Sequence, residues 1–236
     1  PPDLLVAESL RARAAADGAP VWDAEATQQL LAVFGIATAP LAEVTTVADA
    51  QAVARRLRYP VTLTVAGSEP PVQRACIANG RALVRAWKEL RAQAESARLK
   101  VVVQRAPPPG TTGTCAITLS TDSVFGPVIA VGASVRGVAV PRERAVMLPP
   151  LNRRLARDLF AAAGIVEPPE ALVQLLLRVS ALACALPWVR ALALDPVIVA
   201  QDHVEIPAAR ALVDPKRKPL PAYAHMAIHP YPVELE

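Results

Sequence analysis

The hydrophobic pattern of the chain predicts helices at six places. Leu30, Leu31 and Phe34 recur at helical spacing, and Gly35 follows them where a helix capped by Asp23 is expected to end. The other predicted helices cover residues 3–16, 46–57, 81–97, 151–163 and 169–186.

Short apolar runs between these helices predict strands. Thr46 and Asp49 resemble a capping box that opens a helix. Tyr59 ends that helix because it precedes Pro60, and a residue before proline disfavours helical backbone. The short links on either side of this helix predict a βαβ-like unit. The strands expected in the first half of the chain cover residues 41–44, 61–65 and 101–104.

The second half of the chain favours antiparallel strands backed by two helices. These strands are expected over residues 114–120, 127–132, 145–148, 191–200 and 203–206. The sequence therefore predicts an α/β protein of two α+β lobes, with the boundary near residues 101–104. A cleft between the lobes would be lined by that strand, the loop at 106–113 and the strand that begins at 191.

The composition indicates a folded protein in a reducing compartment. Hydrophobic residues make up 53% of the 236 positions, which is enough for a packed core. Cys76, Cys115 and Cys184 are widely spaced and form no C-x-x-C pair, so we expect neither disulfides nor a zinc site. No apolar run is long enough to span a membrane. We therefore predict a cytoplasmic protein with no membrane partner.

One strand is notable for the metal ligands that it lacks. Magnesium at a nucleotide takes oxygen ligands, often carboxylates at alternate positions of one strand. The alternate positions of the strand near 191 are Ala191, Ala193 and Asp195, so Asp195 is its one candidate metal ligand.

Six segments carry a family resemblance. They are LLAVFGIATAP (30–40), YPVTLTV (59–65), VVVQRAPPPG (101–110), DSVFGPVIAVG (122–132), MLPPLN (147–152) and LDPVIVAQDHVEI (194–206). In this order they are similar to the ATP-grasp region of NDP-forming acyl-CoA synthetases, over residues 21–215. The resemblance implies a two-lobed ATP-grasp fold with a nucleotide in the cleft between the lobes.

The tail adds a second resemblance. YAHMAIHPYP (223–232) resembles the segment that joins such a region to an acetyltransferase domain of the GNAT class in bacterial protein lysine acetyltransferases. The Pro-rich ends of the chain also suggest a piece between flanking domains. The expected organisation is an N-terminal helix at 1–20, a first lobe at 21–104, a second lobe at 105–215 and a linker at 216–236.

The chain departs from the family pattern at the positions that bind phosphate and metal in the family. Thr64 stands where the pattern has a lysine that pairs with phosphates, and Cys115 stands where it has a glutamate. The loop that carries a histidine in the family is shortened to residues 66–75, which contain none. Ala191 and Ala193 occupy the acidic positions of the metal strand, and Asp195 replaces an asparagine. These losses together would remove most transition-state stabilisation of phosphoryl transfer.

The sequence therefore favours a degenerate, non-catalytic ATP-grasp domain that regulates or senses ligands for a protein lysine acetyltransferase. The alternatives are an active synthetase subunit and a structural or oligomerising arm. ATP, ADP and acetyl-CoA are the candidate ligands, and other domains of the same chain are the expected partners. The candidate nucleotide-binding residues are Thr64, Arg74, Gln104, Arg105 and Cys115, with Asp195 as the candidate magnesium ligand.

Charge and histidine usage leave two further interpretations open. Residues 53–105 hold eleven Lys or Arg against three acids, which favours either a solvated helix face or attraction of an anion or acidic partner. Arg74 and Arg105 are expected to flank the cleft. Only two aromatic residues, Tyr59 and Trp87, lie among these charges, too few for a base-stacking surface, so nucleic acid is not an expected partner. His203, His225 and His229 lack acidic partners at ligand or triad spacing, so no histidine site is predicted.

Overall fold

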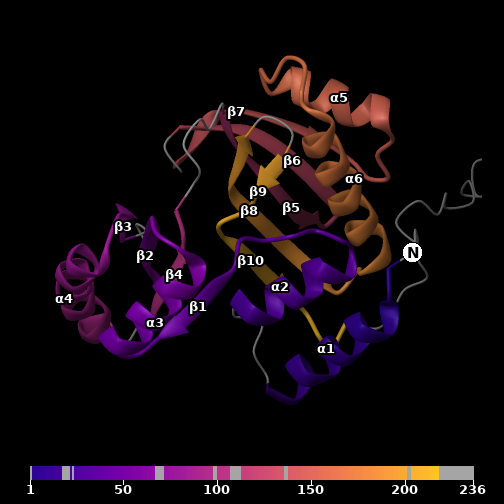
Figure 1. Cartoon of the computed structure of the whole chain (residues 1–236). Helices are drawn as coiled ribbons and strands as arrows, with labels where there is room; N and C mark the ends of the chain where they lie inside the picture. The colour runs from indigo at the N-terminus through magenta and orange to yellow at the C-terminus, as the bar shows by residue number, and fades with distance from the viewer. Residues whose placement is uncertain are drawn as a thin grey trace, which may run out of the picture.

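The computed structural model describes residues 2–17, 22, 24–66, 72–97, 100–106, 113–135, 138–200 and 203–217. These residues form two antiparallel sheets, each with helices on one face, in two lobes that lie side by side (Figure 1). The α/β class and the two-lobed arrangement predicted from the sequence are confirmed. None of the described helices is long and apolar enough to cross a membrane.

The smaller lobe is a four-stranded sheet with two helices. Its strand order is β1-β4-β2-β3, so β4 separates β1 from β2 and pairs antiparallel with both. The predicted βαβ-like unit is therefore a split one, in which β1 and β2 are parallel and do not touch. Its elements are β1 (Leu41–Val44), α3 (Val47–Leu57), β2 (Val61–Ala66), β3 (Gln73–Ile77), α4 (Gly80–Ala97) and β4 (Lys100–Arg105).

The larger lobe is a six-stranded sheet. Strands β10, β8, β5, β6 and β7 follow one another across it, and β9 pairs with β8. Its elements are β5 (Gly113–Asp122), β6 (Gly126–Val135), β7 (Val138–Met147), α5 (Arg153–Ala162), α6 (Glu170–Ala185), β8 (Val189–Ala200), β9 (His203–Glu205) and β10 (Ala209–Val213).

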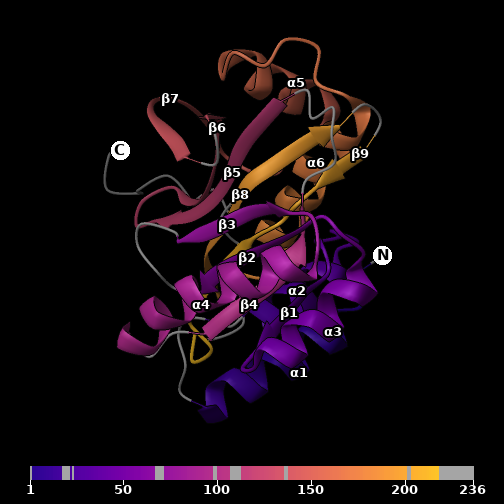
Figure 2. The same ribbon diagram turned by 60° about the vertical axis from the view of Figure 1, so that its left-hand side comes forward.

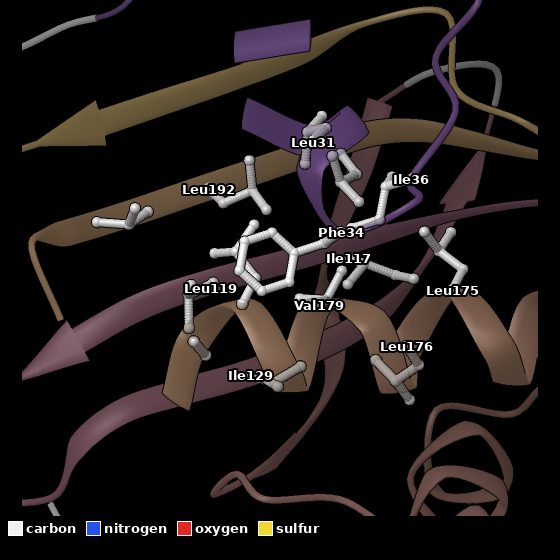
Figure 3. Close-up of a cluster of buried hydrophobic side chains, with 14 of the residues drawn as sticks. Leu31, Phe34, Ile36, Ile117, Leu119, Ile129, Leu175, Leu176, Val179 and Leu192 are labelled. Atoms are coloured by element: carbon white, nitrogen blue, oxygen red, sulfur yellow. The ribbon is translucent and has the colours of Figure 1, made fainter. Parts of the chain in front are cut away.

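The main hydrophobic core lies between the larger sheet and its helices. Ile117 and Leu192 point from the sheet toward Val179 of α6, and Phe34 reaches the same cluster (Figure 3). Apolar residues at alternate strand positions meet apolar helix faces here, as expected for a sheet covered on one side. A separate, smaller core joins the four-stranded sheet to α3 and α4.

The two N-terminal helices, α1 (Leu4–Asp17) and α2 (Ala24–Val33), pack against the larger sheet. Trp22, between them, lies with its ring centroid 5.6 Å from that of Trp188, and its backbone N–H donates to the Ala211 carbonyl. The sequence analysis assigned α2 to a first lobe at 21–104. Its apolar residues instead pack in the core of the larger sheet. Chain order does not determine against which sheet an apolar helix face packs.

Local signals in the sequence located most elements well. The Thr46 hydroxyl accepts a hydrogen bond from the Asp49 backbone N–H at 3.1 Å, which confirms the predicted cap. Asp3 accepts from the Leu5 N–H at 3.1 Å at the start of α1. Strands β3 and β10 were not predicted. The loop at 107–112 and the tail at 218–236 lie outside the described residues.

Candidate functional site

Each sheet has a face that packs on the helices of its own lobe and an opposite face, which we call the inner face. On the smaller sheet Val61, Leu63 and Val65 belong to the helix-packed core, so Thr62 and Thr64 lie on the inner face. Both views place α4 on the far side of this sheet from the larger lobe (Figures 1 and 2). The inner face is therefore turned toward the larger lobe.

The inner face of the smaller sheet carries a neutral polar group of side chains. Thr62 on β2 pairs with Gln104 on β4, and Thr64 is two positions further along β2. The hydroxyl oxygens of both threonines are buried, and neither has a hydrogen-bond partner within the described part of the chain. An unsatisfied buried hydroxyl costs about 1–3 kcal/mol, which makes both atoms candidates for contact with a ligand or water. Thr62 was missed, although its place two residues before Thr64 was a usable signal.

Arg74 does not share this face. It pairs in register with Leu63, so its side chain points toward the helices, and its Nε lies 3.0 Å from Oε2 of Glu89 on α4. The expectation that Arg74 flanks the cleft is therefore corrected by the strand register. That register could not be read from the sequence because β3 itself was not predicted.

Arg105 lies where the two sheets approach one another. Its positive charge acts on Glu205 of β9, so residues from both lobes meet at this point. Burial raises the pKa of Glu205, and the charges of Arg105 and His203 oppose that rise. Arg105 therefore lies near Glu205 of the larger lobe, and its role in nucleotide binding stays a prediction.

The inner face of the larger sheet is lined mainly by small side chains. Leu192 and Leu194 belong to the core, so Ala191, Ala193 and Asp195 occupy the inner face of β8. A cross-strand row runs through Arg210, Ala193, Thr118, Ala130 and Val146. Arg210 is an exposed cation on this face that sequence reasoning missed, because no strand was predicted at 209–213.

Cys115 is placed in the core and not on the inner face. Its side chain is 1% exposed and packs in the cluster that contains Ile117 and Leu119. Burial, with a smaller contribution from the negative charge of Asp195, raises the pKa of the Cys115 thiol to about 12. A neutral, buried thiol cannot replace a glutamate as an anionic ligand.

The residues present do not fit a magnesium site with several carboxylates. Across the ranges that the structure describes, no three His, Cys, Asp or Glu side chains gather in a group that could hold a metal ion. Asp195 is the single carboxylate among the alternate inner-face positions of β8. The arrangement offers hydrogen-bonding hydroxyls, an amide and arginines, which suits a polar or anionic ligand more than a divalent cation.

Two α+β lobes with antiparallel sheets, whose inner faces lie where the lobes meet, define the ATP-grasp class. The chain belongs to this family, because a family model described as an ATP-grasp domain matches residues 13–213.

Solved structures with the same fold cover nearly the whole chain. The protein PH1788 of Pyrococcus horikoshii is 24% identical, with a TM-score of 0.76, and the match covers 89% of this chain and 99% of that one. Dinucleotide forming acetyl-coenzyme A synthetase 1 of Ca. Korarchaeum cryptofilum, in complex with coenzyme A, Ca-AMPCP and HgCl+, is 19% identical with a TM-score of 0.77, over 88% and 99% of the two chains. Both structures therefore share the fold of this chain.

Proposed function

We propose that this ATP-grasp domain has lost phosphoryl-transfer chemistry and acts as a regulatory or ligand-sensing module. The observation that carries the proposal is the inner face of β8, where Ala191 and Ala193 occupy two of the three alternate positions and Asp195 the third. The parent protein would be a lysine acetyltransferase of the GNAT class. That part of the proposal rests on the resemblance of the tail.

The chemistry of phosphoryl transfer explains why these positions matter. The transferred group is stabilised almost entirely by positioned cations and metal ions, since the protein contributes little covalent chemistry. Thr64 supplies a neutral hydroxyl where the family resemblance implies a lysine, and Cys115 is a protonated core thiol. Losing one fixed cation and the metal carboxylates together would reduce the rate on the order of a thousandfold or more.

A ligand can still bind without this chemistry. The related synthetase was solved with coenzyme A and a nucleotide analogue. Arg210 and the Thr62, Thr64 and Gln104 side chains offer hydrogen bonds to a phosphate, a ribose or an amide. We propose acetyl-CoA or an adenine nucleotide, bound without magnesium, as the ligand of this domain.

An active synthetase subunit is the second candidate. Asp195 favours it, because a carboxylate remains on the inner face of β8 and one carboxylate with phosphate oxygens and water can hold magnesium. The two candidates differ in whether ATP binding depends on magnesium.

Isothermal titration calorimetry distinguishes them. The chain is titrated with ATP with and without magnesium, and with acetyl-CoA, alongside an Asp195→Ala variant. We expect magnesium to change ATP affinity less than about threefold, and Asp195→Ala to leave acetyl-CoA binding unchanged. Micromolar ATP binding that requires magnesium and is lost in Asp195→Ala would refute the proposal and support the synthetase.

Thermal denaturation tests the sensing role against a structural arm. A ligand that binds only the native state must raise the melting temperature, by an amount that grows with the logarithm of its concentration. We expect acetyl-CoA or ATP to do so. If none of acetyl-CoA, ATP and ADP shifts the transition at a concentration of about 5 mM, the domain senses none of them and the structural-arm alternative stands.

A further inference from the structure

The outer surface of α4 presents a row of positive charges. Leu83, Trp87 and Leu90 are at most 5% exposed and form the side of the helix that faces the sheet. Arg81, Arg85 and Lys88 follow one another at spacings of four and three residues, so they share the opposite side, and all three are exposed. At about 1.5 Å per residue, the row extends for about 10 Å.

Helix α3 extends this surface with a fourth cation. A methyl group built on Gly80, at the start of α4, would lie 3.8 Å from Nε2 of Gln51 on α3. Arg55 lies one turn beyond Gln51 on the same side of α3 and is exposed. We call Arg55, Arg81, Arg85 and Lys88 the basic helix face.

Within the described residues, no carboxylate forms an ion pair with this face. Arg74 of the same lobe is paired with Glu89 at 3.0 Å. Helix α5 also begins with two arginines, but Arg153 lies 2.8 Å from Glu170 and Arg154 lies 3.9 Å from Asp158. The contrast distinguishes the basic helix face from the paired arginines elsewhere on the molecule.

The stability of α4 does not explain these charges. Arg81 lies in the first turn, which contains no acidic residue, and a cation there opposes the helix dipole. Arg81 and Arg85 are four residues apart, so their like charges repel on one side of the helix. Neither the helix dipole nor the Arg81–Arg85 pair therefore accounts for the charge at Arg81.

We propose that the basic helix face docks an acidic helical segment of a partner protein. Carboxylates one turn apart on such a helix would match the spacing of Arg81, Arg85 and Lys88. Trp87 is buried and Tyr59 is partly buried, so neither offers an open ring for the base stacking that single-stranded nucleic acid uses. This interaction does not depend on the ligand proposed above, because the face lies on the helix side of the sheet.

Fluorescence anisotropy of the full chain tests the proposal with defined probes. One probe is a labelled helical peptide whose glutamates are spaced alternately four and three residues apart. The other probe is a labelled DNA duplex of mixed sequence. An Arg81→Glu/Arg85→Glu variant is compared with an Arg153→Glu/Arg154→Glu variant. The control makes the same change in net charge, also in the first turns of a helix.

We expect the peptide to bind more tightly than the duplex, and the α4 variant to weaken peptide binding at least about tenfold. The α5 control should change it less than about threefold. Equal losses in both variants, or a duplex that binds more tightly than the peptide, would overturn the proposal. Arg81→Glu should also raise the melting temperature, so weaker binding cannot be attributed to unfolding.

Discussion

The buried thiol of Cys115 gives the sharpest test of how the candidate site is built. Its pKa is raised from 9.0 to about 12, mainly by burial and further by the negative charge of Asp195. The thiol of the unfolded chain ionises near its ordinary pKa, whereas the folded protein retains the proton. Unfolding therefore releases a proton at alkaline pH. Stability is unaffected below about pH 9 and decreases as the pH rises toward about 12.

The size of the effect follows from proton linkage. One proton released on unfolding lowers the free energy of unfolding by about 1.4 kcal/mol per pH unit. At about pH 10.5, which is about 1.5 units above the unfolded pKa, the loss due to Cys115 is about 2 kcal/mol. Burial also raises the pKa of Cys184 to about 11, and that thiol contributes equally to the wild type and to a Cys115→Ala variant. The difference between the two proteins therefore isolates Cys115.

Urea denaturation at about pH 8 and pH 10.5 measures this difference. We expect the wild type to lose about 2 kcal/mol more than Cys115→Ala between the two pH values. Cys76→Ala is the control, because it removes an exposed thiol that lies outside the core. Equal losses in the wild type and Cys115→Ala would show that Cys115 ionises in the folded protein. The thiolate would then be a possible anionic ligand, contrary to our argument.

Three further predictions concern the cap, the core and the inner face. Thr46→Ala should cost about 1 kcal/mol in urea denaturation, because its hydroxyl caps α3. Phe34→Ala should cost about 3–5 kcal/mol, since Phe34 is 7% exposed in the main core, whereas Phe125→Ala at a 62% exposed position should cost less than about 0.5 kcal/mol. Ala193→Glu should introduce Mn2+ binding, measured by calorimetry, because it places a second carboxylate about 7 Å along β8 from Asp195. Adding Asp195→Ala should abolish that binding, and Mn2+ binding that survives it would contradict the assigned strand face.

The sequence predicted elements well where a local signal determines the structure. Thr46 and Asp49 are three residues apart, and the cap that they form depends on no distant part of the chain. Strand β3 carried no such signal. Of its five residues only Ile77 is buried, so the strand has no regular alternation to read.

The features that the sequence could not predict depend on contacts between segments that are distant along the chain. Arg74 and Thr64 lie on neighbouring strands, and only the register of β3 against β2 shows that Arg74 points toward α4. The same holds for α2, whose apolar residues Leu30, Leu31 and Phe34 would suit either sheet. Arg210 was missed because β10 is a short strand at the edge of the larger sheet.

Strand β8 separates residues that hold the fold from residues that face the candidate site. Leu192 and Leu194 hold the strand on the helices, whereas Ala191, Ala193 and Asp195 project from its other face. Because alternate side chains do not share an environment, replacing a carboxylate on the inner face removes no contact from the core. A family model that matches most of the chain therefore reports mainly the fold. For this reason, measurements on Asp195 and Ala193 decide the function more directly than any further comparison of the fold.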